Sequence, residues 1–189
     1  MPWKSAIASV LVIALAAASV AADTNDDRRA LVMLRVLAYD KQLSQRVGDD
    51  VRVVVAYTAD DAGIAERTRW ITAFAKASKI TVNGRPVIVV PHRVDSADEL
   101  ARALDHSAAL LVCDGLTRAL SVTTIATLTR NHRVLSISTR EADVVAGLTV
   151  ALVPGKQRDE IVVNLAAARA EGVKFDAGLL QLAREVKGP

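Results

Sequence analysis

Four short apolar runs, separated by segments of helical periodicity, constrain this chain more than any other feature of its sequence. They cover residues 51–57 (VRVVVAY), 86–90 (PVIVV), 108–113 (AALLVC) and 133–138 (RVLSIS), and the first is nearly continuous and mostly β-branched. Runs of this kind are typical of strands buried on both faces of a parallel sheet. Because helical segments connect them, the sequence predicts an α/β fold with three layers, in which helices flank a mostly parallel sheet.

Helix-capping residues precede the predicted helices. The candidate caps are Asp26 or Asp27, Asp60 or Asp61, Ser96 with Glu99 three residues later, Asn164 and Asp176. A further helix is expected over residues 117–131. Gly48 is the predicted stop of the first helix, and Asn83-Gly84 predicts a tight turn before the second strand.

The C-terminal part has a different pattern. Residues 148–153 and 160–163 are apolar, and Pro154-Gly155 lies between them, which predicts a β-hairpin. A short helix ending at Gly172 and a last helix opened by Asp176 are then expected to close the fold. The last helix is predicted to carry Leu179, Leu180, Ala183 and Val186.

The first 22 residues have the features of a secretory signal peptide. Lys4 supplies a positive start, residues 6–17 are an apolar run that only Ser9 interrupts, and an A-x-A-like cleavage site ends at Ala22. The competing interpretation is a membrane anchor. A spanning helix needs about 20 apolar residues, whereas this run is shorter and an acidic stretch begins at Asp23. We therefore expect residues 1–22 to be removed and the protein to work in the periplasm.

The remaining residues, 23–189, suit a single α/β domain. Removing 22 of 189 residues leaves 167, enough for a complete core without disulfides or metals. Of the 24 basic residues only Lys4 is lost, so 23 face 21 acidic ones and the net charge is +2. Nucleic-acid binders usually combine a basic stripe with stacking aromatics, and neither occurs here. No later stretch is long and apolar enough to predict a membrane span.

Motifs of catalysis and cofactor binding are absent from the sequence. His92, His106 and His132 are far apart and have no metal-ligand spacing. There is no G-x-S-x-G elbow and no glycine-rich phosphate loop. Cys113 is the only cysteine; a buried small hydrophobe is the main interpretation, and an interchain disulfide or a nucleophile are the alternatives. We therefore predict no catalytic, metal or cofactor site and no enzyme activity.

The carboxyl edge of the predicted sheet is the candidate site for a ligand or partner. Ligands of open α/β sheets bind outside the carboxyl ends of the strands. The residues expected at that edge are Thr58, Asp114, Gly115, Thr139 and Arg140. The alternative is that these residues only cap helices and form loops.

The C-terminal sequence also resembles a known family. Residues 161–169 (IVVNLAAAR), followed by Gly172 and by residues 179–183 (LLQLA), are similar to the ending of the YfiR-like, or YfiR/HmsC-like, periplasmic proteins. Residues 82–87 (VNGRPV) resemble the family's V-x-G-x-P-V pattern, and the resemblance covers roughly residues 50–186. Many members begin with an aromatic-rich helix, and some carry extra cysteines that form disulfides; this chain has neither feature.

What the resemblance implies is a non-enzymatic regulator. The best-known member is a periplasmic inhibitor that holds an inner-membrane diguanylate cyclase silent. We therefore expect this chain to modulate an inner-membrane sensor protein by direct contact, and homodimerisation is a second partner hypothesis by analogy. The family has no catalytic residues, so no residue-level site is carried over.

Two questions stay open at this stage. Val36, Tyr39 and Leu43 are a candidate partner surface on the first predicted helix, although packing of these side chains onto the sheet is the favoured explanation. The alternative function is a periplasmic small-molecule binding domain that resembles one lobe of a solute-binding protein. Such proteins close two lobes around their ligand, and 167 residues leave no room for a second lobe.

Overall fold

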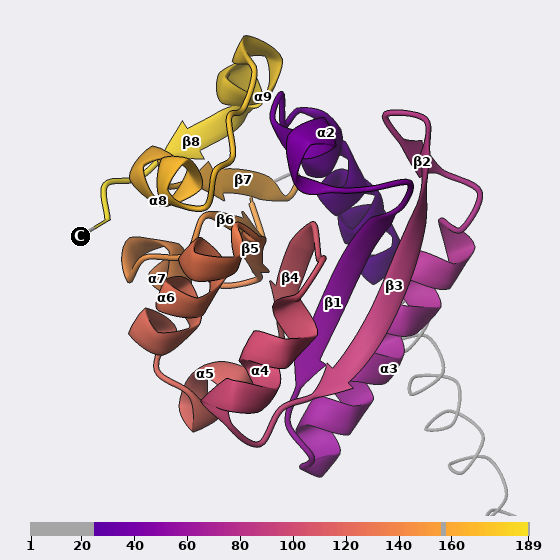
Figure 1. Ribbon diagram of the computed structural model, residues 1–189, viewed down its shortest axis with the longest axis vertical. Coiled ribbons are helices and arrows are strands. Elements are labelled where there is room, and N and C mark those ends of the chain that lie inside the picture. The colour runs from indigo at the N-terminus through magenta and orange to yellow at the C-terminus, as the bar shows by residue number, and fades with distance from the viewer. Residues whose placement is uncertain (1–24, 156–157, 189) are drawn as a thin grey trace, which may run out of the picture.

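The computed structural model describes residues 25–155 and 158–188, so the predicted signal peptide over residues 1–22 lies outside the described residues. One eight-stranded sheet forms the centre of the fold, with the strand order β2-β3-β1-β4-β5-β6-β7-β8 (Figure 1). The strands are β1 (Val51–Tyr57), β2 (Thr81–Val82), β3 (Arg85–Arg93), β4 (Ala109–Val112), β5 (Leu135–Ser138), β6 (Val150–Val153), β7 (Glu160–Val163) and β8 (Ala183–Glu185).

Most strand pairs of this sheet are parallel. Strands β3, β1, β4, β5 and β6 run in one direction, whereas β2 pairs antiparallel with β3 and β7 pairs antiparallel with β6. The predicted α/β sheet and its C-terminal hairpin are therefore confirmed. The sequence did not predict β8, which pairs parallel with β7.

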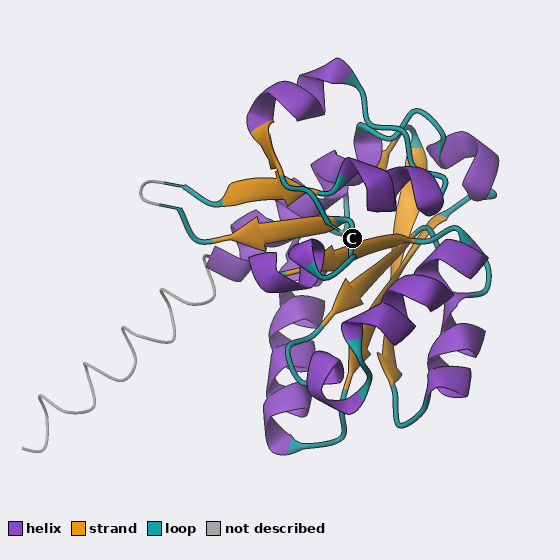
Figure 2. Ribbon diagram, turned by 90° about the vertical axis from the view of Figure 1, so that its left-hand side faces the viewer, coloured by secondary structure: helices purple, strands orange, loops and turns teal. Residues whose placement is uncertain are grey.

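Helices cover both faces of the sheet (Figure 2). They are a first helix over residues 25–38, α2 (Leu43–Arg46), α3 (Asp61–Lys76), α4 (Ala97–Leu104), α5 (Leu116–Ala119), α6 (Val122–His132), α7 (Glu141–Val145), α8 (Leu165–Ala170) and α9 (Ala177–Leu182). Within residues 25–155 and 158–188, none of these helices has the length and apolar character that crossing a bilayer requires.

Strand β1 shows how the three layers are held together. Its side chains alternate between the two faces of the sheet: Val53 and Val55 join a buried cluster with the first helix and α3, while Val54 and Ala56 join a second cluster with α4, α5 and α6. Burying one valine side chain stabilises a fold by about 1.5–3 kcal/mol. The continuous apolar run is therefore explained by a strand that has a core on each side.

Strand β3 differs from the expectation that it is buried. Its outer neighbour β2 pairs with residues 85–86 alone, and Ile88 is 42% exposed. The backbone N–H of Val94, the residue after β3, donates to the Tyr57 carbonyl at 2.9 Å. Because the backbone groups of successive strand residues point in alternate directions, the even-numbered residues of β3 hydrogen-bond toward β1. The odd-numbered residues, which include Pro91, point their backbone groups away from β1 toward the open edge of the sheet. A proline costs no ladder hydrogen bond there.

The predicted capping chemistry is confirmed at four helices. A side-chain oxygen accepts a backbone N–H from the first turn of the helix at Asp60, Ser96, Asn164 and Asp176. The predicted turn between β2 and β3 is also present. Asn83 and Gly84 both have positive φ, 52° and 79°, which are the left-handed values that a two-residue hairpin turn of this kind requires.

Two predicted helices were wrong in extent. The helix expected over residues 117–131 is divided into α5 and α6, because Ser121 accepts the Thr124 N–H at 3.0 Å and starts a new helix. The last helix stops at Leu182, so Ala183 and Val186 are not on it. The residues after Leu182 extend instead and pair with β7, a long-range contact that local periodicity does not contain.

The first helix also ends earlier than predicted, at residue 38 and not near Gly48. The cause is Asp40, whose Oδ1 accepts the backbone N–H of Gln42 and of Lys174, each at 2.9 Å. The same carboxylate pairs with Arg46, and the two side chains are 0% and 1% exposed. These contacts fix the chain between the first helix and β1 against the C-terminal segment.

Candidate functional site

The order of the strands places the predicted edge residues at a reversal point of the fold. The chain passes from β1 to β3 on one side and then crosses to β4 on the other side of β1. Thr58 follows β1, Asp114 and Gly115 follow β4, and Thr139 and Arg140 follow β5. The crevice outside such a reversal is the usual ligand position in open α/β sheets.

Hydrogen bonds connect several of these edge residues. The Thr139 hydroxyl donates to Asp114 Oδ1 at 3.2 Å. Arg140 donates from Nη1 to the Thr117 hydroxyl at 3.1 Å, and its Nη2 lies 3.6 Å from Asp143 Oδ1. The structure thus brings the loops after β4 and β5 together, as expected from the sequence.

Thr58 fills the space between the loops after β1 and β4. A Cβ added to Gly63 would lie 2.3 Å from the Thr58 carbonyl oxygen, and a Cβ added to Gly115 would lie 2.4 Å from the Thr58 hydroxyl oxygen. Only glycine permits this approach at either position. The crevice at the reversal point is therefore closely packed.

A buried carboxyl group that the sequence analysis missed lies beneath this edge. Glu66 on α3 is 8% exposed and accepts the Asp114 N–H at 2.9 Å and the Trp70 indole N–H at 3.5 Å. Burial raises the pKa of Glu66, and the nearby charge of Asp114 raises it further. The sequence signal that could have identified Glu66 is its spacing on α3: it lies on the same helix face as apolar residues such as Trp70, four positions later.

The thiol of Cys113 lies in the same region and is buried, as its place in an apolar run predicted. Burial raises the pKa of Cys113, with a further contribution from the charge of Glu66. A thiol in this environment stays protonated, and the thiolate is the nucleophilic form. The edge therefore presents polar groups for binding and no activated thiol.

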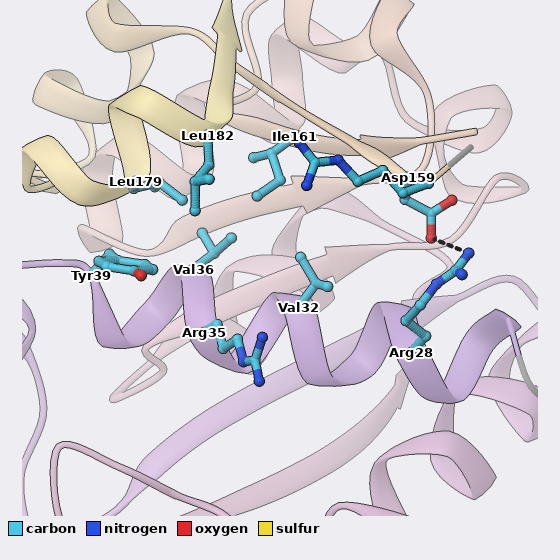
Figure 3. Close-up of a pocket in the computed structure, with 10 residues that line it drawn as sticks. Arg28, Val32, Arg35, Val36, Tyr39, Asp159, Ile161, Leu179 and Leu182 are labelled. Carbon is cyan, nitrogen blue, oxygen red and sulfur yellow. Dashed lines mark hydrogen bonds and ion pairs between the residues drawn. The ribbon is translucent and has the colours of Figure 1, made fainter. Parts of the chain in front are cut away.

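A second candidate site is a groove of about 330 Å³ between the first helix and the C-terminal elements (Figure 3). Val32, Val36 and Tyr39 line it from the first helix and the residue after it, while Leu179 and Leu182 face them from α9. Leu182 is 53% exposed, which is unusual for a large apolar side chain next to a core. The groove thus presents an accessible apolar wall.

The charged residues of this groove are mainly basic. Arg28 and Arg29 both pair with Asp159, at 3.3 and 3.2 Å, so that carboxylate is fully neutralised. Figure 3 shows the pair that Arg28 forms. Arg35 and Arg158 also line the groove and are exposed. Neither forms an ion pair with an acidic residue in the part of the chain that the structure describes. A surface complementary to this groove would therefore be apolar and carry acidic groups.

The predicted partner surface of Val36, Tyr39 and Leu43 needs correction. Val36 on the first helix is 1% exposed and Leu43 on α2 is 0% exposed, and both pack in the core cluster on this side of the sheet. Of the three, only Tyr39 is half-buried, and it lines the end of the groove with Val36 beside it. For Leu43, the alternative interpretation, packing in the core, describes its position.

Metal binding finds no support in the described residues, where no group of three or more His, Cys, Asp or Glu side chains is placed to hold an ion. His132 Nδ1 lies 3.1 Å from Asp105 Oδ1, a pair between α6 and the end of α4.

Comparison with known sequences identifies the family. A family model described as YfiR/HmsC-like matches residues 61–184. The chain belongs to the YfiR/HmsC-like family. The matched region runs from the start of α3 to the middle of β8, and it includes the loops after β4 and β5 but not β1 or Thr58. A search of curated protein sequences finds no match.

Solved structures show where the fold of this YfiR/HmsC-like chain also occurs. A conserved domain protein from Vibrio cholerae O1 biovar eltor has a TM-score of 0.62 at 12% identity, over 86% of this chain and 60% of that one. The ligand-free, open CD0873 of Clostridium difficile, a substrate binding protein with adhesive properties, gives 0.57 at 12%, over 79% and 58%. An ABC domain from Streptococcus pneumonia in complex with L-Trp gives 0.55 at 14%, over 80% and 60%.

This chain thus spans about 60% of the length of the structures it resembles. At 12–14% identity the similarity establishes the fold, an α/β architecture shared with substrate-binding proteins. It does not transfer a ligand or a binding residue, because function depends on the site and not on the fold.

Proposed function

We propose that this chain is a non-enzymatic regulatory protein of the periplasm that controls an inner-membrane signalling protein by direct contact. Membership of the YfiR/HmsC-like family is the observation that carries this proposal. By resemblance to the best-known member, the partner is of the diguanylate-cyclase type. Binding shifts the partner between its states only by as much as the affinities for the two states differ.

The groove between the first helix and α9 is the contact surface that we assign to this function. Aromatic and aliphatic anchors surrounded by polar groups are typical of binding surfaces, and Tyr39, Leu179 and Leu182 meet that description. Arg35 and Arg158 would attract acidic residues of the partner and speed its association. The groove therefore fits an apolar segment of a membrane sensor that carries acidic side chains.

Site-specific photo-cross-linking in the native envelope tests this assignment. A photoreactive amino acid replaces Leu182 in the groove, and a matched variant carries it at Ala119, an exposed residue of α5. We expect Leu182, and not Ala119, to capture one inner-membrane signalling protein, identified by mass spectrometry. If Leu182 captures only copies of this chain, the groove is a homodimer interface and the proposal of a membrane partner is wrong. Equal capture from both positions would contradict the assignment of the groove as the contact surface.

The alternative function is binding of a small solute at the sheet edge, and the structural similarity to substrate-binding proteins favours it. Thermal unfolding measured with a panel of amino acids that includes L-tryptophan examines this alternative. A saturable rise in melting temperature that Asp114→Asn removes would support solute binding. An equal rise in the melting temperature of the Asp114→Asn variant would show that the solute does not bind at the sheet edge.

A further inference from the structure

A second cavity, of about 570 Å³, lies among α6, α8 and the segment that follows α8. Three basic residues line it from three separate segments: Arg133 follows α6, Arg169 is on α8, and Lys174 lies after α8. None of its lining residues is acidic. Like charges gathered around one cavity repel each other unless an anion lies between them.

Arg133 is held in place from two sides. Its φ of 56° is in the left-handed region, which is uncommon for residues other than glycine, and its carbonyl oxygen accepts Arg46 Nη1 at 2.7 Å. Its guanidinium lies against Gly172, where an added Cβ would be 2.8 Å from Nε and 3.0 Å from Nη2. This conformation is the C-cap that ends α6, so the end of the helix and Gly172 together fix where the Arg133 side chain lies.

The nearest buried carboxyl group does not neutralise this cavity. Glu171 precedes Gly172, but its side chain is 0% exposed and accepts hydrogen bonds from Thr129, Ser136 and Thr149 in the interior. Among the described residues, no acidic side chain forms an ion pair with any of the three basic lining residues. The positive charge of the cavity therefore stays uncompensated within the fold.

Apart from Gln42, the rest of the cavity wall is apolar. Ala168, Val173 and Phe175 contribute to it, and its volume falls in the range of about 300–1,000 Å³ that is common for ligand pockets. Arginine forks match the geometry of phosphate oxygens, and lysine adds a point charge to such a site. These lining residues therefore suit a ligand in which a phosphoryl group is attached to an apolar group.

We propose that this cavity binds a small free phosphomonoester. Arg133, Arg169 and Lys174 hold the phosphoryl dianion, and the ester's apolar group packs on Phe175. The site is separate from the groove between the first helix and α9. The proposal of phosphomonoester binding is therefore independent of the proposed regulatory function.

Calorimetric titration of the mature chain with phenyl phosphate and with inorganic phosphate tests the proposal. We expect phenyl phosphate to bind more tightly than inorganic phosphate, and the affinity to fall as salt is added, because salt screens exposed charges. The double variant Arg133→Gln/Arg169→Gln should bind phenyl phosphate at least about tenfold more weakly, since hydrogen bonds to charged groups are strong. Arg102→Gln, on exposed α4 surface, should leave binding unchanged.

Several outcomes would overturn the proposal. Unchanged affinity in the double variant would exclude the cavity, and absence of phenyl phosphate binding to the wild-type chain would exclude the ligand class. If the double variant does not fold, Lys174→Gln changes an exposed side chain and gives the same comparison. Sedimentation with vesicles of phosphatidic acid, but not of phosphatidylcholine, together with no binding of phenyl phosphate, would assign the cavity to a lipid headgroup.

Discussion

The buried carboxyl group of Glu171 offers the most quantitative prediction of this structure. All four of its hydrogen bonds come from neutral donors: the hydroxyls of Thr129 (2.7 Å) and Thr149 (2.6 Å), and the N–H (3.0 Å) and hydroxyl (2.7 Å) of Ser136. Burial raises the pKa of Glu171, and these hydrogen bonds oppose that shift only in part. The informative change is Glu171→Gln, which keeps the shape and removes the titration.

The sign of the pH dependence follows from the raised pKa. The folded chain holds the Glu171 proton more tightly than the unfolded chain, so protonation stabilises the folded state at low pH. That contribution is complete below the unfolded value near 4.5 and is lost as the pH rises through the folded pKa. One group changes the free energy of unfolding by at most about 1.4 kcal/mol per pH unit. The Glu171→Gln variant has no titrating group at this position and contributes no such slope.

The hydrogen bonds also set the cost of the substitutions. The Ser136 N–H only donates, so the amide oxygen of a glutamine would take the position of Oε2, and its NH₂ would face two hydroxyls that can accept. Glu171→Ala leaves the Ser136 N–H and the Thr149 hydroxyl without this acceptor. At about 1–3 kcal/mol for each buried unsatisfied group, we expect a loss of roughly 2–6 kcal/mol.

Denaturant unfolding between pH 4.5 and 8 measures these effects. Trp70, which is 2% exposed, reports the transition by fluorescence, and Glu185→Gln on exposed β8 is the matched control. We expect the stability of the wild-type chain relative to Glu171→Gln to fall as the pH rises from 4.5. Parallel stability curves for the two proteins would refute the reasoning.

Three further predictions concern packing, a buried ion pair and the sheet edge. Gly63→Ala should lower the melting temperature despite the better helix propensity of alanine, because its Cβ would lie 2.3 Å from a backbone oxygen, whereas Gly48→Ala, with nothing within 4 Å, should not. Asp40→Ala should cost about 3–5 kcal/mol in urea unfolding, because it leaves the Arg46 charge buried and unpaired; a loss below about 1 kcal/mol would contradict this. Pro91→Val should promote self-association in analytical ultracentrifugation by restoring an edge N–H, and an unchanged monomer fraction would argue against that role.

The parts of the fold that the sequence predicted depend on local signals. The strand around Val54 is apolar on both faces, and the cap residues Asp60 and Asn164 act on N–H groups within three residues of themselves. Both kinds of signal are contained in short windows of sequence. This is why the sheet, its order of elements and the C-terminal hairpin were predictable.

The features that were missed depend on contacts between distant segments. Strand β8 exists because residues after Leu182 pair with β7, and β3 is half-exposed because β2 is only two residues long. The sheet edge was located correctly from the strand ends, but its closure around Thr58 depends on two glycines far apart in the sequence, Gly63 on α3 and Gly115 just before α5. The groove joins residues about 130 positions apart, as in the Arg28–Asp159 pair, which periodicity does not reveal.

The most direct test of the regulatory function is the activity of the captured membrane partner. Membrane vesicles that contain the partner are assayed for its cytoplasmic activity, cyclic di-GMP synthesis for a diguanylate cyclase, while the purified mature chain is added on the periplasmic side. We expect a saturable change in activity that Arg35→Glu/Leu182→Asp in the groove weakens and Arg102→Gln does not. Activity that stays constant at saturating concentrations of the chain would contradict the proposed control by direct contact.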